Sequence, residues 1–301
     1  MSHSPYRPID LATVDKQIAT RSFGNLVTAV LPEKIIVPNR RFPARQSTFS
    51  DAEGRLAVRV FSPRALSSLP VAAPPATDPF FSSVVLLMHF DGPNGGTVFT
   101  DSTGRHTVGT GSGVVNSSTQ FKFGGASGYF PASVGAYGSI ANSSDFDFGS
   151  GDFCVEFWLW PRTNTGGVQG LWFNVPSVSG RGFVFVANTA NLQLILYDNA
   201  VSLVANITAT SALTGATWHH IAATRSGSAV TIWVNGSSAA TTTVGGSGVI
   251  QPNTTSSSNI GVDPGTLSRL YDGYMDDLRI TKGVARYTSA FTPPTAAFPN
   301  S

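Results

Sequence analysis

The chain has 301 residues, of which 41% are hydrophobic and 12% charged, and its formal net charge is +2. This composition supplies enough apolar side chains for a large core. It excludes an intrinsically disordered chain, which would need high net charge and few apolar residues. A net charge so close to zero gives no whole-chain argument for binding nucleic acid or a membrane surface. The single cysteine, Cys154, excludes intrachain disulfides and zinc sites built from thiolates.

Residues 1–66 are basic and poor in large apolar side chains. Residues 1–78 hold ten Lys and Arg against six Asp and Glu, net +4, whereas the remainder holds nine against eleven, net −2. So small an apolar set makes a weak independent core, and we expect an extended anchoring arm that orders against a partner. Arg40, Arg41 and Arg45 are candidate anchoring residues. Their basic stretch is too short and too poor in aromatics to argue for nucleic acid.

Local patterns in the arm are mixed. Apolar residues from Leu11 to Val30 recur at roughly helical spacing, with a break at Gly24-Asn25, and "KIIVP" and "RLAVRVF" are typical of short strands. Four prolines between Ser67 and Pro79 predict a stiff linker. The N-terminus lacks the layout of a signal peptide, and no apolar run is long enough for a membrane helix. We therefore expect synthesis in a cytoplasm and no membrane insertion.

From residue 80 to residue 301, short apolar runs alternate with clusters of turn residues. The runs read "VVLLMHF", "FCVEFWLW", "FVFVAN", "LQLILY", "WHHIAATR", "AVTIWVNG" and "YMDDLRI". Asn235-Gly236 and Asp272-Gly273 are turn pairs typical of hairpins. Many strands with evenly spaced turns and no clear helix predict an all-β, two-sheet antiparallel sandwich. Successive apolar residues in "EFWLW" indicate a strand covered on both faces.

Five blocks, in this order, resemble the laminin-G-like domains of concanavalin-A-like jelly-roll fold that recur in bacteriophage structural proteins. They read "LLMHFDGPNGGTVFTDSTGRH", "FKFGGASGYF", "SSDFDFGSGDFCVEFWLWPR", "WHHIAATRSGSAVTIWVNG" and "YDGYMDDLRITKGVARYTSAFTPPTAAFP". The resemblance extends from Phe80 to Pro299, and residues 1–77 resemble no family. It implies two packed sheets of six or seven strands each, and roles in adhesion, carbohydrate contact or virion architecture. Such domains occur in many proteins, so the fold alone does not give the function.

Two adjacent carboxylates, Asp276 and Asp277, lie in the middle of an otherwise apolar predicted strand. Side chains alternate along a strand, so we expect the pair on opposite sides of the sheet, with Asp277 facing solvent or paired with an arginine. The resemblance implies a structural calcium ion near Asp276, which Asp101 would share and Asp91 would join as a weaker ligand; oxygen ligands suit Ca²⁺. The alternative is that Asp276 accepts backbone hydrogen bonds, while Arg279 or Arg286 neutralises Asp277.

Sugar sites need flat aromatic faces beside a few fixed polar groups. Four aromatics near predicted loops or strand ends are therefore candidate glycan-binding residues: Trp172, Tyr137, Tyr197 and Tyr271. Three tryptophans inside apolar strands are expected in the core instead: Trp158, Trp218 and Trp233. His219 and His220 resemble an ion-ligand pair, but adjacent strand residues diverge, so we expect a structural role for both.

An enzyme is the competing hypothesis. Glycan hydrolases of this fold usually place two carboxylates on one strand, across the scissile bond. Glu156 is the only glutamate of the predicted sandwich, and no acidic residue follows it two or four positions on. The chain has no Gly-x-Ser-x-Gly elbow, and Cys154 lies in an apolar strand without evident activation. We expect a protein without catalytic residues.

These observations favour a non-enzymatic component of a phage particle. Its arm would bind other virion proteins of the capsid or tail, through residues 1–77. Its sandwich would face outward as a lectin-like domain for adhesion, contact with host-surface glycans or stabilisation of the particle. No sustained heptad seam is visible, which favours a head decoration or compact tail appendage over a tail fibre. We expect a homo-oligomer on the virion exterior. The alternative is a glycan-degrading enzyme, either of a tail spike or secreted.

Overall fold

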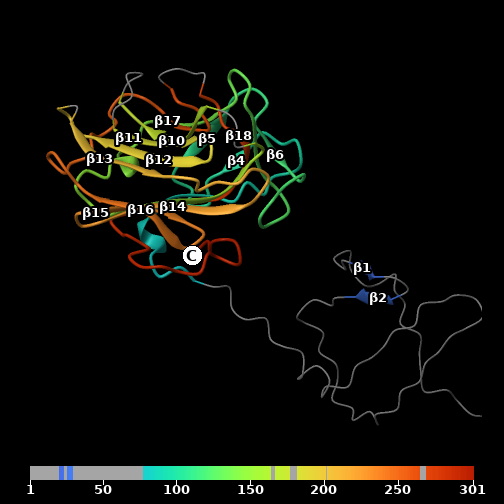
Figure 1. Cartoon of the computed structure of the whole chain (residues 1–301). Helices are drawn as coiled ribbons and strands as arrows, with labels where there is room; N and C mark the ends of the chain where they lie inside the picture. Colours follow the sequence, from blue (N-terminus) through green and yellow to red (C-terminus); the bar gives the residue numbers. More distant parts are fainter. Residues whose placement is uncertain are drawn as a thin grey trace, which may run out of the picture. The chain divides into compact units, whose positions relative to one another are not determined.

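The computed structural model describes residues 20–23, 26–29, 77–163, 167–176, 182–200, 202–264 and 269–301 (Figure 1). The chain divides into two units, Met1–Ala72 and Ala73–Ser301. In the first unit, β1 (Thr20–Phe23) pairs antiparallel with β2 (Leu26–Ala29). The helical spacing predicted there does not hold for residues 20–23 and 26–29, which form two strands that pair with each other, whereas Leu11, Val14 and Ile18 lie outside the described residues. The anchoring arginines and the other predicted strands of the arm lie outside the described residues.

The second unit is a sandwich of two antiparallel sheets. The first sheet has the order β13 (Leu203–Ala209), β12 (Asn191–Tyr197), β11 (Phe183–Asn188), β10 (Val168–Asn174), β17 (Ser258–Ile260), β8 (Gly138–Ile140), β5 (Thr107–Thr110), β4 (Phe99–Thr100). The second has the order β16 (Ser237–Thr243), β15 (Ala229–Val234), β14 (His219–Ser226), β9 (Phe153–Pro161), β18 (Asp272–Lys282), β7 (Ser127–Pro131), β6 (Val115–Ser117). Strand β3 (Val84–Met88) joins the second sheet by pairing with β18.

The predicted fold class, an antiparallel jelly-roll sandwich, is confirmed. Each sheet has eight strands in the described part of the chain, somewhat more than the six or seven that the resemblance implies. The described helices there are two short 3₁₀ turns, η2 (Phe81–Ser83) and η3 (Ser144–Phe146). Among the described residues, no helix is long and apolar enough to cross a bilayer.

Strand β9 shows how the sequence builds the core. Phe153, Val155, Phe157 and Leu159 alternate along it and pack between the sheets with apolar residues of the facing strands. The residues between them point to the outer face of the second sheet, yet β9 is buried on both faces, as its sequence predicts. A second layer must therefore cover that outer face.

The cover is the C-terminal segment, residues 283–301. Tyr287 and Phe291 pack on the outer face around Trp233, and Phe298 packs with residues of β3. The backbone N–H of Asp78 donates to the carbonyl of Ser301 at 2.7 Å. Figure 1 shows the chain's end beside the first residues of the sandwich, on the side where β14 to β16 lie.

Of the two predicted hairpin pairs, one is confirmed. Asn235 and Gly236 connect β15 to β16, and both have positive φ, 50° and 82°, as a tight two-residue turn requires. A Cβ on Gly236 would lie 1.8 Å from the carbonyl oxygen of Phe291, so the C-terminal segment also needs glycine there. The other prediction is wrong: Asp272 and Gly273 begin strand β18, where both pair with β7 and Gly273 also pairs with β9.

Candidate functional site

Strand β18 changes neighbours at its centre. Up to Met275 it pairs with β7, and from Leu278 it pairs with β3, while β9 follows it along the other edge. The register against β9 shifts between Asp276 and Arg279, and Asp277 has a positive φ of 49°. One extra residue here makes a β-bulge, a device that re-aims side chains. Simple alternation therefore does not hold across the two carboxylates.

The carboxylate of Asp276 is buried and held by backbone. Its Oδ2 accepts hydrogen bonds from the backbone N–H groups of Lys122, at 2.7 Å, and Phe123, at 3.1 Å. Burial raises the pKa of Asp276 to about 7; the two hydrogen bonds lower it by less than burial raises it, and the nearby carboxylates of Asp277 and Asp91 add a smaller increase. Asp276 is thus a group that titrates near neutral pH inside a nearly sealed site.

Asp277 is also fully buried, so the expectation that it faces solvent or pairs with an arginine is wrong. Its Oδ1 contacts Nδ1 of His89, and its Oδ2 accepts the backbone N–H of Phe298 at 2.8 Å. The Nε2 of His89 lies 2.9 Å from Oδ1 of Asn300. Burial alone would lower the pKa of His89, but its hydrogen bonds to Asp277 and Asn300 outweigh burial and raise it. The bulge thereby ties β18 to both β3 and the C-terminal segment.

The carboxylate of the predicted calcium ligand Asp101 is occupied by hydrogen bonds, most of them within its own turn. Its carboxylate accepts five hydrogen bonds: from Leu87 N, Thr103 N, Thr103 Oγ1, Arg105 N and His106 N, at 2.7–3.1 Å. A carboxylate so placed fixes the loop that follows β4 and links it to β3. This role explains a buried aspartate without any ion.

The three predicted ligands do not form one ligand set. Asp276 interacts electrostatically with Asp91, whereas the carboxylate oxygens of Asp101 accept hydrogen bonds from the turn that follows it. Within the described part of the chain, no group of three or more His, Cys, Asp or Glu is arranged to hold a metal ion. The residues present therefore do not fit a calcium ion shared by Asp276 and Asp101. The calcium prediction depends on the chelation experiment given in the Discussion.

A second buried charged group lies on the same outer face, around Glu156. Its Oε1 accepts from Arg279 Nη2 at 2.8 Å, and its Oε2 accepts from the hydroxyl of Tyr287 at 2.7 Å and lies 3.3 Å from Nε2 of His220. Burial alone would raise the pKa of Glu156, but the charges of Arg279 and His220 outweigh it and hold the pKa far below its usual range. Glu156 is ionised and sealed.

The network extends to the start of the sandwich through Asp78. Arg279 Nη1 and Arg286 Nη2 contact Oδ2 of Asp78 at 3.0 and 2.7 Å, and Arg286 Nη1 contacts its Oδ1 at 2.9 Å. The alternative in which Arg279 or Arg286 neutralises Asp277 is therefore wrong. Both arginines instead hold Asp78 against the outer face, while Asp277 uses a histidine and a backbone N–H.

The structure separates the four aromatic glycan candidates. Trp172 and Tyr271 are 0% exposed and belong to the main core, so their assignment to a glycan surface is wrong. Trp172 packs edge-on against Phe146 in the core, and its strand β10 lies inside the first sheet, between β11 and β17. Tyr137 and Tyr197 are half-buried, and their role in glycan contact stays a prediction.

The residues expected to be structural lie largely where the sequence placed them. Trp158 and Trp233 are buried, whereas Trp218 is half-buried. His219 and His220 contact different groups: His219 Nε2 accepts the backbone N–H of Thr214, and His220 lies beside Glu156. The two imidazoles therefore do not form an ion-binding pair.

These features define a two-sheet jelly-roll β-sandwich with a buried charge network on its outer face. A family model, the concanavalin A-like lectin/glucanases superfamily, matches residues 132–286. The chain belongs to that superfamily. No curated protein matches the sequence.

Solved structures with the same fold include toxin binding domains. The binding domain of Paraclostridial Mosquitocidal Protein 1 is 15% identical with a TM-score of 0.54, over 71% of this chain and 50% of that one. The receptor binding domain of botulinum neurotoxin D is 14% identical with a TM-score of 0.52, over 68% and 51%. The serotype D ligand binding domain in complex with N-acetylneuraminic acid is 14% identical with a TM-score of 0.53, over 68% and 49%. This chain spans about half the length of each, and at such identity the similarity establishes the fold alone.

Proposed function

We propose that the sandwich is a non-catalytic domain that binds carbohydrate. The observation that carries this proposal is the burial of Glu156, which is 0% exposed and held by Arg279, Tyr287 and His220. The superfamily contains both lectins and glucanases. A glucanase needs carboxylates that reach the scissile bond, and Glu156 reaches only its own network.

Three other groups that could do chemistry, Asp276, Asp277 and Cys154, are buried as well. Asp276 and Asp277 are 1% and 0% exposed. Burial raises the pKa of the Cys154 thiol well above its usual range, and the neighbouring Glu156 charge raises it further, so a thiolate nucleophile does not form there. Binding without turnover is the function that this arrangement supports. The toxin domains with the same fold are described as binding domains, which supports the same function here.

The test is to apply the full-length protein to an array of neutral, sialylated, sulfated and uronic-acid glycans, and to incubate it with the glycans that it binds. We expect retention on at least one glycan class and no release of reducing ends. Release of reducing ends would instead support the alternative, a glycan-degrading enzyme. Absence of binding to every class would remove carbohydrate recognition.

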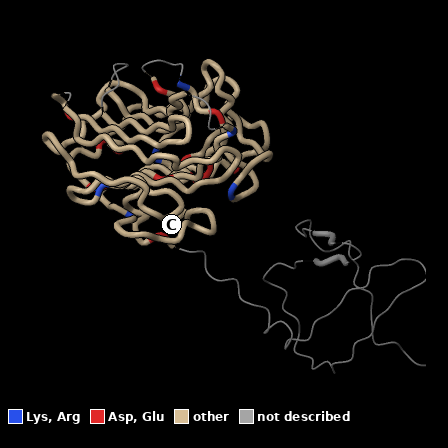
Figure 2. The backbone as a smooth tube through the Cα atoms, viewed as in Figure 1, with Lys and Arg blue, Asp and Glu red and all other residues tan. Residues whose placement is uncertain are grey.

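We further propose that the domain is displayed on the exterior of a phage particle, as a homo-oligomer bound to capsid or tail proteins through residues 1–77. Three sequence features support this proposal: the net charge of +4 in residues 1–78, the proline-rich linker, and the resemblance to domains of phage structural proteins. Figure 2 shows few Lys, Arg, Asp and Glu residues along the chain of the sandwich. In this arrangement the sandwich would face outward.

Attachment is testable by charge reversal in the arm. Changing Arg40, Arg41 and Arg45 together to Glu should lower the occupancy of the protein on particles, because charge pairs at an interface matter by about 2–5 kcal/mol when one partner is lost. The melting temperature of the sandwich should not change. Occupancy is measured on purified particles by quantitative mass spectrometry, with Lys282→Glu in the sandwich as the control. Normal occupancy of the triple variant would contradict electrostatic anchoring.

A further inference from the structure

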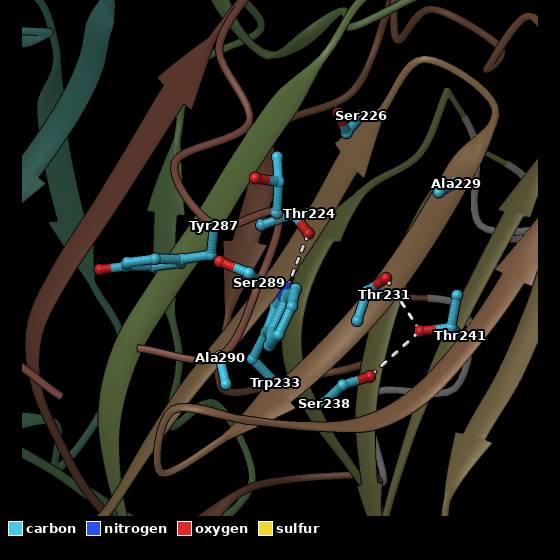
Figure 3. A pocket seen from close by; sticks show the side chains of 11 residues that line it. Thr224, Ser226, Ala229, Thr231, Trp233, Ser238, Thr241, Tyr287, Ser289 and Ala290 are labelled. Carbon is cyan, nitrogen blue, oxygen red and sulfur yellow. Dashed lines mark hydrogen bonds between the residues drawn. The ribbon is translucent and has the colours of Figure 1, made fainter. Parts of the chain in front are cut away.

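A groove of about 430 Å³ lies on the outer face of the second sheet (Figure 3). Strands β14, β15 and β16 form one wall, and residues 287–290 of the C-terminal segment form the other. The volume falls within the range of about 300–1,000 Å³ that is usual for ligand pockets. The groove belongs to neither the bulge of β18 nor the aromatic candidates that the sequence suggested.

Hydroxyl groups cross the groove in one row. Thr224 pairs directly with Thr231, and Thr231 pairs directly with Thr241, so the register places one threonine from each of three strands side by side. Thr241 Oγ1 lies 3.0 Å from Thr231 Oγ1 and 3.2 Å from Ser238 Oγ. Hydroxyls both donate and accept, and the backbone pairing fixes their spacing. Thr224 and Thr231 are buried whereas Thr241 and Ser238 are exposed, so the outer end of the row presents the polar groups to a ligand.

Two aromatic side chains complete the groove. The indole N–H of Trp233 donates to Thr224 Oγ1 at 2.8 Å, which fixes the ring in the floor. Tyr287 lies in the opposite wall, stacked on Phe291 with ring centroids 3.5 Å apart. Figure 3 shows its hydroxyl pointing away from the threonine row. Trp233 is 4% exposed and forms the base of the groove, so half-buried Tyr287 is the aromatic side chain that a ligand can reach. An aromatic side chain beside a few ordered polar groups is the combination that sugar rings require.

Charge is absent from the groove. None of its lining residues, all within the described part of the chain, is acidic or basic. Arg225 lies between Thr224 and Ser226 but points to the other side of β14, where it donates to the carbonyls of Gly149, Gly227 and Gly248. A carboxylate or sulfate on a ligand would lose its water here without gaining a cation, which costs free energy.

We propose that this groove binds an uncharged oligosaccharide. The inference rests on the proposed function of carbohydrate binding and names both its place and its ligand class. In this respect the chain would differ from the neurotoxin domain of the same fold that is described with N-acetylneuraminic acid, an anionic sugar. Neutral hexose and N-acetylhexosamine units offer hydroxyls and apolar faces that match the exposed hydroxyls of Thr241 and Ser238 and the ring of Tyr287.

The experiment uses the full-length chain and a panel of neutral hexose and N-acetylhexosamine oligomers beside sialylated and sulfated ones, followed by calorimetry with the best ligand. Ala290→Trp, at an exposed position of the wall, should fill the groove and weaken binding at least tenfold. Thr241→Val should weaken it about three- to tenfold, as expected for loss of one hydrogen bond between neutral groups. Thr243→Val, on the same strand and the same face but outside the groove, is the matched control and should bind normally.

Each outcome distinguishes the two proposals. Selective binding of neutral oligomers that Ala290→Trp and Thr241→Val weaken, with unchanged melting curves, supports the groove. Binding that neither variant changes overturns the groove and leaves the proposed function intact. Preference for charged glycans overturns the ligand class. Failure to bind any glycan overturns both the inference and the proposed function.

Discussion

Changing Glu156 to glutamine should lower the melting temperature of the sandwich by roughly 10 °C. The variant keeps the size of the side chain but leaves the buried Arg279 and Arg286 with Asp78 as their acidic partner. Removing one member of a buried ion pair costs about 3–5 kcal/mol, and each kcal/mol shifts the midpoint by about 2–4 °C in a domain of this size. Differential scanning calorimetry measures the change.

The matched control is Arg105→Gln. Arg105 also forms an ion pair, with Asp145 at 3.6 Å, but its side chain is 46% exposed. Exposed pairs contribute less than about 1 kcal/mol, so this variant should melt within a few degrees of the wild type. Equal midpoints for Glu156→Gln and the wild type would show that the buried network adds no stability.

The second large effect is a loss of stability as the pH rises from about 4 to 8. The pKa of Asp276 is about 7 in the folded protein, mainly because it is buried, whereas the usual value is 3.8. Between those values the folded state binds the proton that the unfolded state has lost, so the free energy of unfolding falls with increasing pH. A shift of about three units corresponds to roughly 4 kcal/mol at most.

Other titrating groups also determine how the free energy of unfolding varies with pH. The pKa of His89 is raised by its hydrogen bonds to Asp277 and Asn300, against the effect of burial, so His89 also contributes stability that is lost with rising pH. Burial alone would raise the pKa of Asp78, but its hydrogen bonds to Arg286 outweigh burial and lower it. Burial would likewise raise the pKa of Glu156, and the charge of Arg279 contributes to lowering it instead. The stability from these two carboxylates is lost as the pH falls below about 4. Maximum stability is therefore expected near pH 5.

Asp276→Asn isolates the contribution of the Asp276 carboxylate to the pH dependence of stability. It removes the charge and keeps an oxygen that can accept from Lys122 and Phe123, so the variant should be more stable than the wild type at pH 8 and should lose less stability between pH 5 and 8. Urea unfolding at several pH values measures this. Asp145→Asn, on the surface, is the control and should follow the wild-type curve. Identical slopes for Asp276→Asn and wild type would contradict a titrating Asp276.

Chelation tests the calcium prediction in the same experiment. A bound cation would hold Asp276 ionised, remove the pH dependence above pH 5, and stabilise the folded state by about 2.7 kcal/mol at 100 times its Kd. EDTA would then lower the wild-type midpoint and leave Asp276→Asn unchanged. The carboxylate oxygens of Asp101 already accept hydrogen bonds within its own turn, so we do not expect an ion shared by Asp276 and Asp101. EDTA should then leave the wild-type midpoint unchanged. An EDTA effect that Asp276→Asn abolishes, with calcium in elemental analysis, would establish the ion.

The sequence predicted the sandwich because the relevant signals are local. The alternation in β9 and the Asn235-Gly236 turn are each contained within a few consecutive residues. It could not predict the partners of Asp277, because the bulge depends on β18 changing its neighbour from β7 to β3, strands more than a hundred residues away. Trp172 was misplaced for a similar reason: the polar residues and glycines around β10 resemble a loop until β17 pairs with it.

The threonine row was missed although each member is visible in the sequence. Thr224, Thr231 and Thr241 are spaced seven and ten residues apart, and only the hairpin registers of β14, β15 and β16 place them side by side. The wall formed by Tyr287 adds a contact that no periodicity encodes. A search for outward-facing threonines in successive predicted hairpins would have found the row, but not the groove.

The meeting of Asp78 with Ser301 has a mechanical consequence. If the arm is fixed to a surface and a ligand in the groove is pulled away from it, the load enters through the wall at residues 287–290 and leaves through Asp78. Arg286 lies next to that wall and contacts Asp78 directly. Part of the tension would therefore cross a few residues of the outer face, and the rest would enter strands β14 to β16 through the other wall of the groove. The ion pairs of Asp78 would bear the first part of this load.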